Sequence, residues 1–113
     1  MNSIRLLLEY KAFPVWIYDE EGLVIDTCLP LEWQDDTELE SIWQQVIDIY
    51  DSLFIDTNVE FKFVGFESQD AKDGFIKLVN QARSMLEKKN NGKYVITDDL
   101  EPESISVKSN EQA

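Results

Sequence analysis

The first hydrophobic pattern in the chain is an alternation with a period of two residues. From position 4 to position 10, every second residue is apolar or aromatic: Ile4, Leu6, Leu8 and Tyr10. Such spacing places these side chains on one face of an extended chain and therefore predicts a β-strand. Pro14 has no backbone N–H to donate to a neighbouring strand, so we expect a break or a sheet edge there.

A β-hairpin is expected next. The runs VWIY at 15–18 and LVI at 23–25 are rich in β-branched and aromatic residues, and they flank DEEG at 19–22. Gly22 can adopt the positive φ angle that a short hairpin loop needs.

Two amphipathic helices follow from apolar residues spaced three and four positions apart. The first is predicted over 37–55, starting at a capping box made by Thr37 and Glu40. Its apolar positions are Leu39, Ile42, Trp43, Val46, Tyr50, Leu53 and Phe54. The second is predicted over 69–89, with Ser68 as its N-cap. Its apolar positions are Ala71, Phe75, Leu78, Val79, Ala82, Met85 and Leu86.

Two short strands complete the predicted fold, one over 60–64 and one over 94–96. From Asp98 onward the chain is polar, acidic and free of aromatic residues, which predicts a flexible acidic tail over 98–113. Residues 1–97 are then a single globular α+β domain. We expect a mostly antiparallel sheet of about four or five strands, with two helices packed on one face.

Composition limits the location and the chemistry of the protein. Its 113 residues are 43% hydrophobic, enough for a core without disulfides, and Cys28 is the only cysteine. No apolar run is long enough to span a membrane, and the first residues lack a signal-peptide cleavage site. We therefore expect a cytoplasmic protein with no membrane contact.

Histidine is absent, and neither a phosphate-binding nor a dinucleotide-binding glycine motif occurs. Histidine-based catalysis and the common zinc sites are therefore excluded, and we expect no catalytic residues, no cofactor and no metal. A pair of carboxylates acting as in glycosidases, or a calcium module, is left as an alternative of another class. The acidic runs 19–22 and 34–40 do not match the EF-hand pattern.

The charge distribution is the most unusual feature of the sequence. The net charge is −13, and the interval between Lys11 and Lys62 holds thirteen acidic residues without one lysine or arginine. Residues 62–93, in contrast, carry seven basic residues against four acidic ones. A generic acidic surface that maintains solubility is one explanation, but solubility does not require this segregation.

The alternative explanation is a docking surface for a basic protein, since an acidic patch accelerates capture of such a partner and repels nucleic acid. Trp33 is the expected apolar anchor because it lies in a connector, and Trp16 is a second candidate. The acidic residues expected on this surface are Asp19, Glu20, Glu21, Asp35, Asp36, Glu40, Asp48 and Asp51.

Three segments carry a resemblance to a known class of protein: FPVWIYDEEGLVIDTCLPLEW, DDTELESIWQQVIDIYDSLFID and EFKFVGF. Their layout is similar to that of the small cytosolic immunity proteins encoded beside polymorphic toxins in Gram-positive bacteria, over residues 13–97. The resemblance implies an immunity protein or antitoxin that binds and blocks a toxin, with no catalytic residues. Nuclease toxins have a basic groove that an acidic inhibitor can cover. An acidic nucleic-acid mimic, or a regulatory adaptor for another basic protein, is the alternative.

The first testable prediction concerns salt. Thirteen unneutralised negative charges repel one another in the folded chain, and salt screens charges over about 8–10 Å at physiological ionic strength. The melting temperature of the protein should therefore rise as NaCl is raised from low to moderate concentration. A flat or falling melting temperature would contradict a crowded acidic surface.

Overall fold

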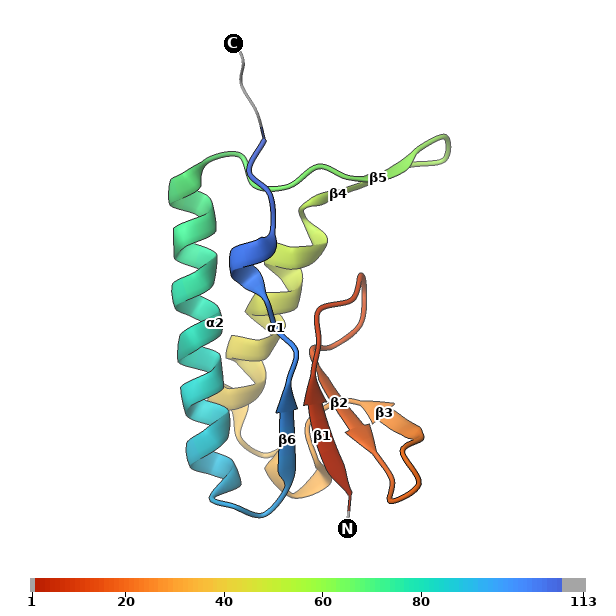
Figure 1. The fold of residues 1–113 in the computed structure, drawn as a ribbon, viewed down its shortest axis with the longest axis vertical. Coiled ribbons are helices and arrows are strands. Elements are labelled where there is room, and N and C mark those ends of the chain that lie inside the picture. Colours follow the sequence, from red (N-terminus) through yellow and green to blue (C-terminus); the bar gives the residue numbers. More distant parts are fainter. Residues whose placement is uncertain (1, 109–113) are drawn as a thin grey trace.

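The computed structural model describes residues 2–108 of the chain. Three strands precede the first helix, two lie between the helices, and one follows the second helix, an α+β order (Figure 1). The elements are β1 (Ser3–Leu6), β2 (Val15–Tyr18), β3 (Val24–Thr27), the 3₁₀ turn η1 (Leu31–Trp33), α1 (Thr37–Asp51), β4 (Phe54–Asp56), β5 (Phe61–Phe63), α2 (Gln69–Asn90), β6 (Val95–Asp98) and the 3₁₀ turn η2 (Pro102–Ser104).

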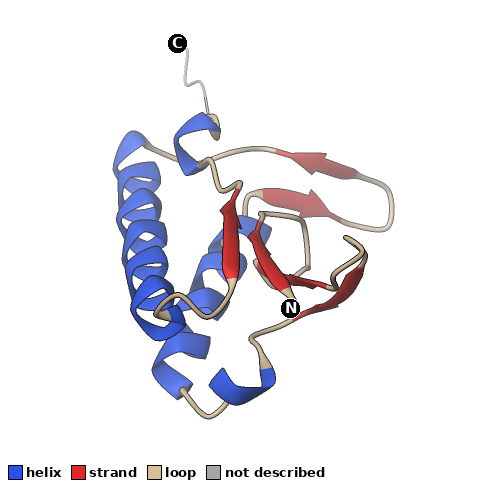
Figure 2. Cartoon of the chain, turned by 60° about the horizontal axis from the view of Figure 1, so that its bottom comes forward, coloured by secondary structure: helices blue, strands red, loops and turns tan. Residues whose placement is uncertain are grey.

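A four-stranded sheet with the order β3-β2-β1-β6 is the centre of the fold. The β1–β2 and β2–β3 pairs are antiparallel, and β6 runs parallel to β1. Both helices lie on the same side of this sheet (Figure 2). The expected α+β fold, with a mostly antiparallel sheet and two helices, is therefore confirmed. Strands β4 and β5 pair only with each other, and their hairpin extends away from the sheet (Figure 1).

The core lies between the sheet and the helices. On β1, Ile4 and Leu6 are buried while Ser3 and Arg5 are half-buried, so the predicted alternation identifies the covered face. Helix α1 contributes Leu39, Ile42, Trp43, Val46 and Ile47, and α2 contributes Phe75, Val79, Ala82 and Leu86. Burying each of the larger side chains stabilises the fold by about 1.5–3 kcal/mol.

Helix α1 begins and ends differently from its prediction. Its N-cap is Asp36, whose carboxylate accepts a hydrogen bond from the amide of Leu39 at 3.0 Å, so Thr37 is the first helical residue and not the cap. The helix ends at Asp51 rather than near 55. The reason is that the carbonyl of Leu53 accepts a hydrogen bond from Val64 at 2.7 Å, which turns the chain into the β4–β5 hairpin.

Helix α2 matches its prediction closely. Ser68 is the N-cap, and its hydroxyl accepts a hydrogen bond from the amide of Ala71 at 3.1 Å. The C-cap, Asn91, has a left-handed conformation with φ of 46°. Such a residue ends a helix because it turns the backbone away from the helical path.

The prediction of a flexible tail over 98–113 is wrong for the segment 98–108, which packs on the core. Leu100 is only 4% exposed, and residue 107 forms a parallel bridge with Phe66. The amide of Phe66 donates to the carbonyl of Ser106 at 3.0 Å. A β-carbon at Gly65 would lie 2.6 Å from that same carbonyl oxygen, so a glycine is needed there. The remaining part of the expected tail, 109–113, lies outside the described residues.

A second prediction tests this packing. Leu100→Ala removes a buried side chain and should lower the free energy of unfolding by about 2–4 kcal/mol. Leu31→Ala is the matched control, because Leu31 is 82% exposed and its loss should change stability by less than about 0.5 kcal/mol. Urea unfolding measures both. Equal midpoints for the two variants would mean that the 98–108 segment does not stabilise the domain.

Candidate functional site

The outward side of α1 is acidic because its other side is committed to the core. Glu40, Gln44 and Asp48 follow one another at four-residue steps, and all three are exposed. The amide of Gln44 donates a hydrogen bond to the carboxylate of Asp48 at 2.9 Å. A shallow depression of about 490 Å³ follows this side of the helix and is lined by Thr37, Glu40, Ser41, Gln44, Gln45 and Asp48. We call Glu40, Gln44 and Asp48 the α1 stripe.

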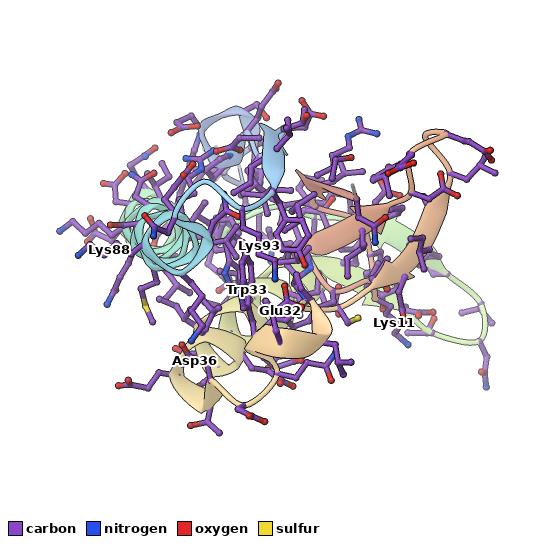
Figure 3. The ribbon with its side chains drawn as sticks, turned by 90° about the horizontal axis from the view of Figure 1, so that it is seen from below. Lys11, Glu32, Trp33, Asp36, Lys88 and Lys93 are labelled. Carbon is purple, nitrogen blue, oxygen red and sulfur yellow. The ribbon has the colours of Figure 1, made fainter. Side chains whose placement is uncertain are left out.

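The acidic start of α1 lies against the basic end of α2. The ammonium of Lys89 is 3.2 Å from the carboxylate of Asp36, and that of Lys93 is 2.7 Å from the carboxylate of Glu32. Figure 3 shows Lys93 beside Glu32 at this end of the molecule. Charges segregated along the sequence are thus partly neutralised in the fold. Ion pairs this exposed contribute about 0–1 kcal/mol each, so their main effect is on the surface charge.

Glu32 is the most strongly perturbed carboxylate of this end. Hydrogen bonds from Lys93 and from the hydroxyl of Tyr94 lower the pKa of Glu32 to about 2. Burial, and then the contact with Glu32, raise the pKa of Tyr94 to about 12. Neither residue is among the predicted site residues, because nothing local in the sequence links positions this far apart.

Trp33 is buried, so the prediction that it is an exposed apolar anchor is wrong. Its side chain is 4% exposed and contacts the ring of Tyr94 edge-on, with 5.4 Å between the ring centroids. The 3₁₀ turn η1 carries it inward, so Trp33 belongs to the core. Trp16 is half-buried on β2. Neither tryptophan therefore projects freely from the acidic surface.

Three of the predicted acidic residues have structural roles. Asp36 caps α1 and pairs with Lys89. Asp51 accepts a hydrogen bond at 2.8 Å from the amide of Lys11, a residue with φ of 59°. Asp19 accepts hydrogen bonds from two amides of its own loop, at 2.9 and 3.0 Å. Substituting any of these would disturb the fold as well as the surface.

The structure does not gather the predicted residues into one patch. Glu20 and Glu21 are exposed in the β2–β3 loop, and Asp35 is exposed just before α1. Seen from below, the β2–β3 hairpin and Asp36 lie on opposite sides of the molecule (Figure 3). The loop, the start of α1 and the α1 stripe are therefore separate acidic areas, of which the start of α1 is partly neutralised.

The described part of the chain contains neither a metal-binding group of side chains nor a membrane-spanning helix. Residues 2–108 contain no group of three or more histidine, cysteine, aspartate or glutamate side chains arranged to hold a metal ion. Within that same range, neither helix has the length and apolar character needed to cross a bilayer.

Comparisons with known proteins give no family. The sequence matches no protein-family model, and it matches no curated protein. The function therefore has to be argued from the fold and from its charged surfaces.

The third prediction concerns pH. A folded-state pKa of about 2 lies below the ordinary glutamate value of about 4.3, so Glu32 stabilises the fold above the latter pH. That contribution should disappear as the pH falls from about 4.3 through 2. NMR titration of the Glu32 carboxyl carbon should give a midpoint near 2, which Lys93→Met should raise. An ordinary midpoint in the parent protein would contradict the described hydrogen bonds.

Proposed function

We propose that this chain is an immunity protein or antitoxin that binds a basic toxin domain in the cytoplasm and occludes its active surface. The observation that carries the proposal is the α1 stripe. Its carboxylates face solvent, and no lysine or arginine occurs anywhere between residues 12 and 61 to neutralise them locally. The resemblance of residues 13–97 to small immunity proteins favours the same class.

Simple electrostatics explains how such a surface works. Internal ion pairs engage Glu32 and Asp36, whereas Glu40 makes no ion pair within the described residues. The carboxylates that stay open to solvent attract a cationic surface over a distance of about one Debye length, 8–10 Å at physiological salt. They thereby increase the rate of association more than they strengthen the final complex.

The mechanism requires no chemistry by this chain. A fifteen-residue helix is about 22 Å long, enough to lie along a groove that binds a phosphate backbone. A nuclease toxin has such a groove, and covering it excludes the nucleic acid. A regulatory adaptor or a nucleic-acid mimic would use the same stripe, so the identity of the partner distinguishes these functions.

The fourth prediction tests the stripe. Glu40 and Asp48 are exposed, and the only contact described for their carboxylates is the hydrogen bond from Gln44, so Glu40→Lys and Asp48→Lys are combined in one variant. The matched control combines Glu87→Lys and Glu101→Lys, which change the net charge equally at exposed positions elsewhere. In this experiment the protein tested as the partner is the product of the gene adjacent to the one that encodes this chain.

The first variant should associate at least about tenfold more slowly and lose protection of cells that express the partner, whereas the control should retain both. Stopped-flow mixing and growth assays measure the two effects. If the parent protein neither binds nor protects, the immunity function is wrong. If both variants behave alike, net charge rather than the α1 stripe governs binding.

A further inference from the structure

Strand β3 is an outer strand with an uncovered apolar side. It pairs with β2 on one side, and no other strand of the described chain pairs with it. Three consecutive apolar residues are exposed there: Leu23 at 63%, Val24 at 48% and Ile25 at 54%. Proteins usually protect such an edge with charges, proline or a covering element, because an apolar edge invites pairing with another strand.

A β-bulge lies within this exposed segment. Val24 lies opposite Tyr18, whereas Asp26 lies opposite Ile17, and the register shifts between these pairs. Neighbouring residues of β2 point to opposite faces, so Val24 and Asp26 also point to opposite faces although they are two positions apart. Ile25 is the extra residue of the bulge and has no partner across the strand pair.

A hydrogen bond in the β2–β3 loop shows to which side of β3 the N–H and C=O groups of Val24 point. The carbonyl of Leu23 accepts a hydrogen bond from the amide of Asp19 at 2.9 Å, so it faces β2. Backbone groups of successive strand residues point alternately to either side. The N–H and C=O of Val24 therefore face the open side of the sheet, where an added strand would bond to them.

A pocket lies at the far end of this edge. Its volume is about 310 Å³, and it is lined by Phe13, Thr27, Cys28, Leu29, Gln34 and Glu40. Gln34 fixes one wall by donating a hydrogen bond to the carbonyl of Leu29 at 2.9 Å. Phe13, Cys28 and Leu29 suit an alkyl stem, and the carboxylate of Glu40 suits a terminal cation.

Glu40 joins this pocket to the α1 stripe, since the same residue lines both depressions. An apolar strand edge and an acidic helix face are therefore continuous on the surface. A partner that pairs with β3 would bring its basic residues directly onto α1.

We propose that β3 receives an extended strand from the basic partner, so that the sheet gains a strand, with a lysine or arginine side chain of that strand in the Cys28–Glu40 pocket. This mode of docking deepens the proposed function and rests on it. Main-chain hydrogen bonds to Val24 would supply affinity, and the pocket would supply specificity.

The charges around the edge favour a basic strand over a second copy of this chain. Glu21, Asp26 and Glu40 lie on or beside the edge and its pocket, and a copy paired through β3 would bring the same acids close together. The opposite edge, β6, is less suitable because Arg83 of α2 reaches across to Asp98 at 2.8 Å.

The β4–β5 hairpin is also apolar but lacks this charge pattern. Phe61 stacks on Phe54 at 5.6 Å between centroids, so part of its surface is already used. Lys62 pairs with Glu60, and Lys11 pairs with Asp56, so the carboxylates of that hairpin are already neutralised locally. The hairpin therefore offers a basic partner less free negative charge than the β3 edge does.

The experiment uses the full chain and, as probe, a blocked nine-residue peptide in which valine and lysine alternate. NMR titration of the labelled protein should shift the amide signals of residues 23–28 and of Glu40. A peptide with glutamate in place of lysine should produce no such shifts. Shifts confined to α2 or to the β4–β5 hairpin, or no binding of the lysine peptide, would overturn the proposal.

The fifth prediction isolates the strand pairing. Val24→Pro removes the outward N–H and should weaken peptide binding by about tenfold, while edge strands tolerate proline where the N–H faces solvent. Val24→Thr keeps the N–H and should weaken binding by less than about threefold. Glu40→Gln should also weaken binding, because it removes the carboxylate of the pocket. Equal affinity of the proline and threonine variants, with both folded by circular dichroism, would overturn strand pairing.

Failure of this docking mode can be separated from failure of the proposed function. If the parent protein binds and neutralises the adjacent gene's product but Val24→Pro does so equally well, the function holds and strand pairing is wrong. If the peptide binds as described but the adjacent gene's product does not, strand pairing holds and the immunity function is wrong.

Discussion

Burial of one side of α1 determines the rest of this molecule. Trp43 and Val46 are completely buried between the sheet and α2, and Leu39, Ile42 and Ile47 on the same side of the helix are buried with them. A helix that commits these positions to the core must turn Glu40 and Asp48 toward solvent. The acidic stripe is thus a geometric consequence of the packing, and the same packing places Glu40 beside the end of β3.

Charge segregation along the chain has two different outcomes in the fold. At the end where α1 begins and α2 finishes, opposite charges meet, and Asp36 pairs with Lys89 while Glu32 pairs with Lys93. On the outward side of α1, Glu40 and Asp48 form no ion pair within residues 2–108, so their carboxylates remain available to a partner. This difference explains why a count of acidic residues overstates the proposed docking surface, and why the proposal for α1 rests on the stripe rather than on the start of the helix.

Local signals in the sequence predicted much of the fold, including the β2–β3 hairpin and nearly all of α2. Errors arose where distant contacts override local pattern. Leu53 continues the apolar spacing of α1, yet its carbonyl accepts a hydrogen bond from the amide of Val64, and the helix ends before it. Leu100 stands alone in a polar segment, so no periodicity indicated its burial. Trp33 was expected outside because it lies in a connector, but its contact with Tyr94 cannot be inferred from one sequence.

The most direct test of the account is hydrogen–deuterium exchange of this protein, free and in complex with the product of the adjacent gene. Strand pairing on β3 and docking along α1 predict that the complex slows exchange at residues 23–28 and over the outward side of α1. The β4–β5 hairpin and α2 should exchange at unchanged rates. Protection confined to Phe61–Phe63 or to α2, with β3 unaffected, would contradict the account.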